Sequence, residues 1–151
     1  MDSAPQQIRV ELESLLDNVS LAEEIGVRIA EAVGFDEDDQ YKIGMSVRES
    51  IINAIEYGNK LQREKKVYLV FEFVPDRLVI RVVDQGKGFR LEDVPDPLTA
   101  ENLLKVSGRG ILMIQAFMDE LDVRTAAIGG AELVMTKRFR SARCGSPADF
   151  G

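Results

Sequence analysis

The chain has 151 residues, a formal net charge of −7, and a composition that is 45% hydrophobic and 30% charged. This length predicts one domain with a sizeable core, and the composition is that of an ordinary soluble globular protein. The acidic balance argues against a general nucleic-acid binder, which usually has a basic surface. Because the sequence has no histidine, it excludes His-ligated zinc, Ser-His-Asp triads and a phospho-accepting histidine.

The single cysteine, Cys144, allows no intrachain disulfide, which fits a reducing cytoplasm. The N-terminal region has no apolar stretch of the signal-peptide kind. No apolar run approaches the ~18 residues that a transmembrane helix needs. We therefore expect a cytoplasmic protein that binds neither a membrane nor nucleic acid directly.

In chain order, the hydrophobic patterns predict a strand over 8–12, a helix over 18–33, a helix over 36–57, a hairpin of strands over 66–74 and 78–84, a helix over 111–118, and strands over 121–126 and 132–138. The acidic run from Asp36 to Asp39 is interpreted as an N-cap and first helical turn. It lacks the alternating ligands and closing glutamate of a calcium loop.

Two segments show no sustained periodicity. Residues 89–107 form a long connection inside a compact domain, and such connections are often functional lids. Residues 141–151 are small and polar, which predicts a flexible tail after a single domain over 1–140. The grouped helices and hairpin strands predict an α+β fold, a two-layer sandwich with helices packed on one face of a mixed, mainly antiparallel sheet.

A helix over 47–58 places Glu49 and Asn53 on one face, one turn apart. Taken alone, this pair fits a solvated face better than a site. An asparagine oxygen nevertheless suits Mg²⁺ that is also held by substrate phosphates. A glutamate one turn away can accept a proton from an attacking hydroxyl.

The strand over 78–84 ends in Asp84, and the chain then passes through Gly86 and Gly88. Glycine lets a flat ligand approach the backbone closely. An ionised aspartate only accepts hydrogen bonds, so it can accept one from the exocyclic amine of adenine. An ordinary glycine-rich turn after a hairpin is the alternative at this point.

The segment Ser107-Gly-Arg-Gly110 leads directly into the helix over 111–118. Free N–H groups and the positive dipole end make such a junction suitable for an anion. Lys105 and Arg109 add charge suited to phosphate. The alternative is a glycine hinge, and the spacing is neither that of a Walker A loop nor that of a Rossmann fingerprint.

One ligand, a nucleotide with its metal, explains all three motifs. In order, they resemble the boxes of the GHKL ATPases, which have the Bergerat fold. Glu49-x-x-x-Asn53 is similar to the N box, Asp84-x-Gly86-x-Gly88 to the G1 box, and Gly108-x-Gly110 to the G2 box. The resemblance covers roughly residues 8–138. Within this superfamily, the motif sequences and the small size resemble the bacterial anti-sigma factor, serine-protein kinase group.

The resemblance implies Mg-ATP bound by Asn53, Asp84, Gly86, Gly88, Gly108 and Gly110, with Asn53 as metal ligand and Glu49 as catalytic base. Lys105 and Arg109 join the expected cofactor-binding residues through their charge. The resemblance also implies phosphorylation of a serine on an anti-anti-sigma (STAS) partner, sequestration of a sigma factor, and homodimerisation. The alternatives are an ATP-binding partner-switching regulator with little or no kinase activity, and a domain that has lost the nucleotide.

The chain departs from the family pattern at four positions. Tyr57 stands where many members have histidine, and Val106 where some have arginine. Ala131 stands where a threonine often contacts adenine through water, and Lys87 adds a charge in a variable position. The glutamate, asparagine, aspartate and glycines are all retained, so these departures bear on kinase turnover more than on nucleotide binding.

Overall fold

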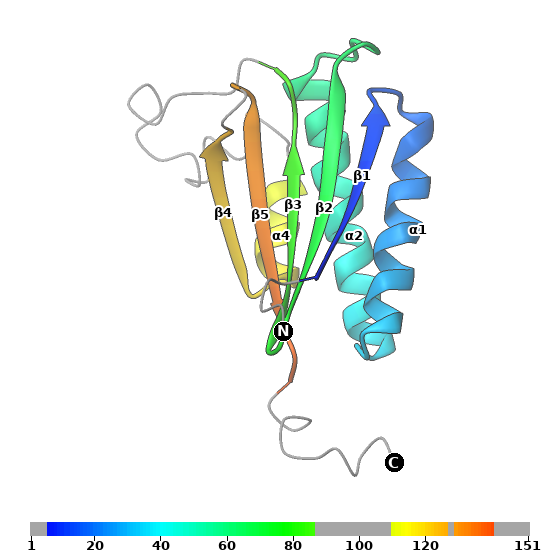
Figure 1. Cartoon of the computed structure of the whole chain (residues 1–151), viewed down its shortest axis with the longest axis vertical. Coiled ribbons are helices and arrows are strands. Elements are labelled where there is room, and N and C mark those ends of the chain that lie inside the picture. Colours follow the sequence, from blue (N-terminus) through cyan, green and yellow to red (C-terminus); the bar gives the residue numbers. More distant parts are fainter. Residues whose placement is uncertain (1–5, 87–109, 127–128, 141–151) are drawn as a thin grey trace.

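The computed structural model describes residues 6–86, 110–126 and 129–140 (Figure 1). Its elements are β1 (Gln6–Glu13), α1 (Asp17–Ala32), α2 (Glu37–Asn53), the π-helical turn η1 (Ala54–Gly58), β2 (Lys66–Val74), β3 (Arg77–Val83), α4 (Gly110–Phe117), β4 (Glu120–Thr125) and β5 (Ala131–Arg138). Within the described ranges, no helix is long and apolar enough to cross a membrane. The predicted lid over 89–107 and tail over 141–151 lie outside the described residues.

The five strands form one sheet in the order β1-β2-β3-β5-β4, and all four pairings are antiparallel. The helices lie together behind this sheet (Figure 1). The α+β sandwich predicted from the element order is therefore confirmed. The predicted hairpin is also present, with Val74 paired to Arg77 across a two-residue turn.

The core lies between the helices and one face of the sheet. Leu78, Ile80 and Val82 alternate along β3 and are buried against the helices. Arg81 lies on the opposite face, as the period-two pattern predicts. Its guanidinium pairs with Glu72 on β2 and Glu132 on β5, each at 3.1 Å, so this face of the sheet carries a paired charge.

The helix predicted to continue to Tyr57 changes its hydrogen bonding at Asn53. The α-helix ends there, and a π turn follows in which the Asn59 N–H donates to the Ala54 carbonyl at 2.8 Å. π turns are rare and occur often at functional sites. The wider turn ends at Gly58, whose backbone lies directly against the end of β3. The predicted helix was thus right in position and wrong in its last turn.

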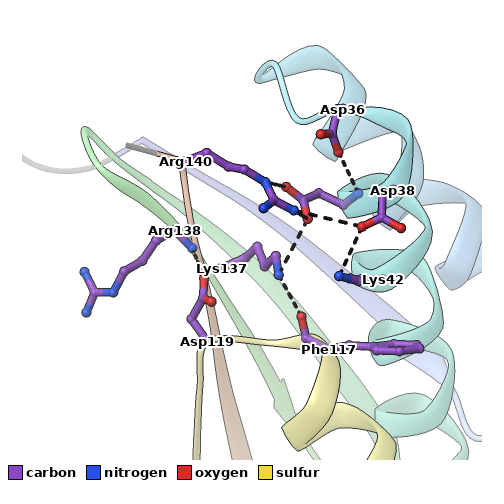
Figure 2. Close-up of polar contacts among 9 residues, drawn as sticks. Asp36, Asp38, Lys42, Phe117, Asp119, Lys137, Arg138 and Arg140 are labelled. Carbon is purple, nitrogen blue, oxygen red and sulfur yellow. Dashed lines mark hydrogen bonds and ion pairs between the residues drawn. The ribbon is translucent and has the colours of Figure 1, made fainter. Parts of the chain in front are cut away.

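The N-terminus of α2 confirms the predicted cap. The Asp36 carboxylate accepts from the Asp39 N–H at 2.9 Å. Asp39 itself is fully buried, and its carboxylate pairs with Arg140 at 2.9 and 3.1 Å and with Lys137 at 3.6 Å (Figure 2). Lys137 also donates to the Phe117 carbonyl at 2.8 Å. These residues connect the start of α2 to the end of β5, and we call this region the Asp39 end.

Candidate functional site

The opposite end of the sandwich, upper in Figure 1, brings together the end of α2 with η1, the end of β3 and the start of β5. We call it the Asp84 end. Of the predicted site residues, Glu49, Asn53, Asp84, Gly86 and Gly110 are described. Four others, Gly88, Lys105, Gly108 and Arg109, lie outside the described residues.

Asn53 is a buried amide without a complete set of partners. Its side chain is 8% exposed, and its Nδ2 atom is buried and makes no hydrogen bond in the described part of the chain. Among the described residues, the Ser46 hydroxyl is the one other buried side-chain group without a hydrogen bond. Leaving a buried donor unpaired costs about 1–3 kcal/mol. The Asn53 Oδ1 atom makes no hydrogen bond with a described residue either, so both atoms of the amide are available to a ligand.

Asp84 is a buried carboxylate that is bonded through one oxygen. Oδ1 accepts from the Gly86 and Ala131 N–H groups, both at 3.0 Å. Oδ2 accepts no hydrogen bond from a described residue. Burial raises the pKa of Asp84 above its ordinary value, while the two N–H donors act in the opposite direction. The side chain is therefore held in one orientation with its second oxygen available.

Three glycines allow the backbone to close around Asp84. A Cβ on Gly58 would lie 2.1 Å from Asp84 Oδ2, and one on Gly130 would lie 1.9 Å from the Asp84 carbonyl oxygen. A Cβ on Gly86 would lie 1.9 Å from the Gly58 carbonyl oxygen. Real Cβ contacts are never this short, so each position requires glycine. The motif spacing predicted Gly86, whereas no motif in the sequence included Gly130.

Glu49 lies on α2 one turn before Asn53 and is partly exposed. It makes no hydrogen bond or ion pair with a described residue, so its carboxylate is free to accept a proton. Gly110 is buried at the first turn of α4, which packs against α2. Tyr57, at the family's histidine position, is 48% exposed on η1.

Asn59 is a buried residue of this end for which the sequence motifs predicted no role. It follows Gly58 and is fully buried, with a side-chain hydrogen bond to the backbone of Gln85, next to Asp84. Nothing in the neighbouring sequence distinguishes Asn59 from an ordinary loop asparagine, and only the fold shows that its side chain is buried.

Comparisons with known sequences point to one family. The family model described as "Histidine kinase-like ATPase domain" matches residues 12–137. The chain is 32% identical over 101 residues to an anti-sigma F factor of Clostridium perfringens, which covers 66% of this chain and 72% of that one. It is 31% identical over 115 residues to the serine-protein kinase RsbW of Bacillus licheniformis, covering 72% and 71%.

Solved structures show the same fold at lower identity. The RsbU and RsbW domains of a Mycobacterium tuberculosis protein match with a TM-score of 0.62 and 16% identity, over 88% of this chain and 32% of that chain. The chain thus spans about a third of that longer protein. The catalytic domain of the histidine kinase ThkA matches with a TM-score of 0.50 and 13% identity, over 87% and 96%.

Proposed function

The chain belongs to the histidine kinase-like ATPase family, and from this premise we propose that it is an ATP-dependent serine kinase and anti-sigma factor. This membership confirms the family that the three motifs predicted, and it implies use of ATP. The protein's partners would be a STAS-type anti-anti-sigma protein, phosphorylated on serine, and a sigma factor. The relatives named anti-sigma F factor and serine-protein kinase RsbW support this proposal.

The observation that carries the proposal is the partnerless Asn53 amide at the same end of the sandwich as the free oxygen of Asp84. Native proteins rarely bury a polar atom without a partner. Adenine would lie against Asp84, with its exocyclic amine donating to Oδ2. Guanine has an oxygen at that position, and an ionised carboxylate cannot donate to it, so this contact selects adenine.

Asn53 would hold the metal. Within the described residues, no group of three or more acidic, cysteine or histidine side chains is placed to bind one. Mg²⁺ needs only one or two protein ligands when substrate phosphates and waters complete its octahedron, so a single amide oxygen fits it. When bound, the ion would neutralise charge on the phosphates. Gly88, Lys105, Gly108 and Arg109 are proposed as further contacts to the nucleotide.

Glu49 would act as the catalytic base. From its place one turn before Asn53, it would accept the proton of the partner's serine hydroxyl as that oxygen bonds to the γ-phosphorus. The bond from this phosphorus to the bridging oxygen would break, with ADP as the leaving group. Help of this kind is typically worth ~10²–10⁴-fold in rate. The proposal also includes a homodimer in the cytoplasm, as the family resemblance implies.

The test is transfer of label from γ-³²P-ATP to a candidate STAS protein. Glu49→Ala should abolish transfer, and Glu49→Gln should lower it by ~10²-fold or more, while calorimetric affinity for Mg-ATP stays near that of the wild type. Transfer by Glu49→Ala at the wild-type rate would show that the base assignment is wrong. Absence of binding heat with the wild-type chain would refute ATP binding itself.

Ala131 supports a second candidate function, an ATP-gated partner-switching regulator with little turnover. This residue offers its backbone N–H to Asp84, but it has no hydroxyl for the water-mediated adenine contact that a threonine would make. In the same experiment, Mg-ATP binding by the wild type without label transfer to the STAS protein would favour this candidate.

A further inference from the structure

Asn59 is a fully buried amide that the proposed chemistry does not use. Its Nδ2 donates to Ser14 Oγ at 2.8 Å and to the Lys66 carbonyl at 3.0 Å. Its Oδ1 accepts from the Gln85 N–H at 2.8 Å. The Lys66 carbonyl can only accept and the Gln85 N–H can only donate. These two partners therefore determine which atom of the Asn59 amide is nitrogen and which is oxygen. Unlike the Asn53 amide, this one has partners on both sides.

These partners belong to three separate parts of the fold. Ser14 follows β1 and donates in turn to the Lys65 carbonyl at 2.5 Å. Lys66 begins β2, and Gln85 follows directly after Asp84. The Gln85 side chain continues the connection, because its Oε1 accepts from the Lys66 N–H at 2.6 Å. Asn59 therefore connects the residue after Gly58 to the residue after Asp84 inside one buried hydrogen-bond network.

The backbone around Asn59 adopts an uncommon conformation. Lys60 and Leu61, the next two residues, have φ of 55° and 60°. Residues other than glycine rarely adopt the left-handed region, and they stay there when the surrounding structure enforces it. The Asn59 carbonyl accepts from the Gln62 N–H at 3.0 Å, and the Leu61 N–H donates to the Ile55 carbonyl at 2.8 Å. The chain thus leaves η1 along a constrained path while the Asn59 side chain points inward.

We propose that Asn59 is a positioning residue for nucleotide recognition, acting through its hydrogen bond to the Gln85 backbone. This inference rests on the proposed ATP site. Asn53 would contact the metal and Asp84 the adenine, so recognition depends on how the end of α2 is placed against the end of β3. Gly58 and Asp84 lie in direct contact there, and small displacements of binding groups have large effects on function. Asn59 sets this placement without touching the nucleotide.

The test compares two alanine variants of the full chain. Asn59→Ala removes the bond to Gln85 and both bonds of Nδ2. Ser14→Ala is the matched control, since it removes a buried partner of the same amide but keeps the Gln85 bond. Calorimetry gives the affinities for Mg-ATP and Mg-GTP, and thermal unfolding gives the midpoint of each variant.

Asn59→Ala should weaken Mg-ATP binding about tenfold or more. It should also lower the ratio of the Mg-ATP affinity to the Mg-GTP affinity. Ser14→Ala should lower the unfolding midpoint but keep the ATP affinity within about twofold and the ATP preference unchanged. A merely structural role would lower the midpoint in both variants and leave the ATP-to-GTP ratio of Asn59→Ala at the wild-type value. That result would overturn the inference.

If Asn59→Ala does not fold, Asn59→Ser replaces it. Its hydroxyl fills part of the space but is too short to reach the Gln85 N–H, and the same outcomes are expected of it. If the wild-type chain shows no heat with Mg-ATP, the proposed function fails and this inference fails with it. If the wild type binds and the Asn59 variant binds with equal affinity and preference, only the positioning role is refuted.

Discussion

The two ends of α2 differ in what their buried polar groups bind. At the Asp39 end, the Asp39 carboxylate and the Lys137 ammonium are buried and paired with each other, and each has a further protein partner. At the Asp84 end, the Asn53 amide has a buried nitrogen without a partner, and Asp84 uses one of its two oxygens. Both ends belong to the same sandwich, and each contains a buried aspartate.

We infer that this difference separates groups that stabilise the fold from groups that would bind a ligand. Buried polar atoms in native proteins nearly always have partners. Where the protein supplies the partners of a charged pair, removing one partner leaves the other charge buried and uncompensated, which lowers stability. Where the protein does not supply them, removing the group should affect binding more than folding. Mutations at the two ends should therefore have opposite consequences.

The largest effect on stability is expected for Asp39→Ala. This change leaves Lys137, whose side chain is 9% exposed, without its carboxylate. Breaking a buried pair in this way costs about 3 kcal/mol. Urea unfolding should show this loss as a lower midpoint with an unchanged slope, while the folded variant binds Mg-ATP as the wild type does.

Two variants sharpen this prediction. Asp38→Ala is the matched control, because Asp38 is the neighbouring acid but is 64% exposed, and it should change stability by less than about 0.5 kcal/mol.

Asn53→Ala should abolish Mg-ATP binding with an unfolding free energy within about 1 kcal/mol of the wild type. The comparison between the ends fails if Asn53→Ala destabilises the chain as much as Asp39→Ala does.

A smaller loss of stability, with a large loss of binding, is expected for Gly130→Ala. The new Cβ would overlap the Asp84 carbonyl oxygen, and relieving such overpacking typically costs 1–3 kcal/mol. Because Asp84 must move, Mg-ATP affinity should fall at least about tenfold. Gly129→Ala is the control: it has open space but φ of +103°, so it should lower stability by about 1 kcal/mol and leave binding intact. Equal ATP affinities for the two variants would contradict the proposed contact.

The smallest effect is a pH dependence at Asp84. Burial raises its pKa in the folded chain above the ordinary 3.8, so the folded state holds this proton more tightly than the unfolded state does. The contribution of Asp84 to stability is therefore present below about 3.8 and is lost as pH rises through the folded-state pKa. The unfolding free energy of the wild type minus that of Asp84→Asn should fall across this range. A difference that rises with pH would show that the pKa is lowered instead.

Local patterns predicted most of the fold. The bounds of β2 are as predicted. The Asp36 cap and the shared face of Leu78, Ile80 and Val82 on β3 follow from near-neighbour chemistry. The π turn after Asn53 was missed because its five residues are too few for an apolar pattern to distinguish a π turn from an α turn. The pairing of Asp39 was missed because Arg140 lies 101 residues away along the chain, and only the sheet brings the two together.

The candidate site divides in the same way. Asn53, Asp84 and Gly86 are recognisable because their motifs are short and local. Gly130 and Asn59 contribute through contacts with backbone from other strands, which no spacing within their own segments indicates. The predicted roles of Glu49, Asn53 and Asp84 in catalysis and binding stay predictions until the experiments above are done, as do those of the residues between 87 and 109.

The length of α2 has an electrostatic consequence. Asp39 and Asn53 are fourteen positions apart on it, which at 1.5 Å per residue is about 21 Å. Physiological salt screens charges through solvent over about 8 Å. Surface charges near the Asp39 end can therefore change, altering solubility or the attraction of a charged partner, while the potential that an anionic nucleotide would meet at the proposed site stays nearly constant.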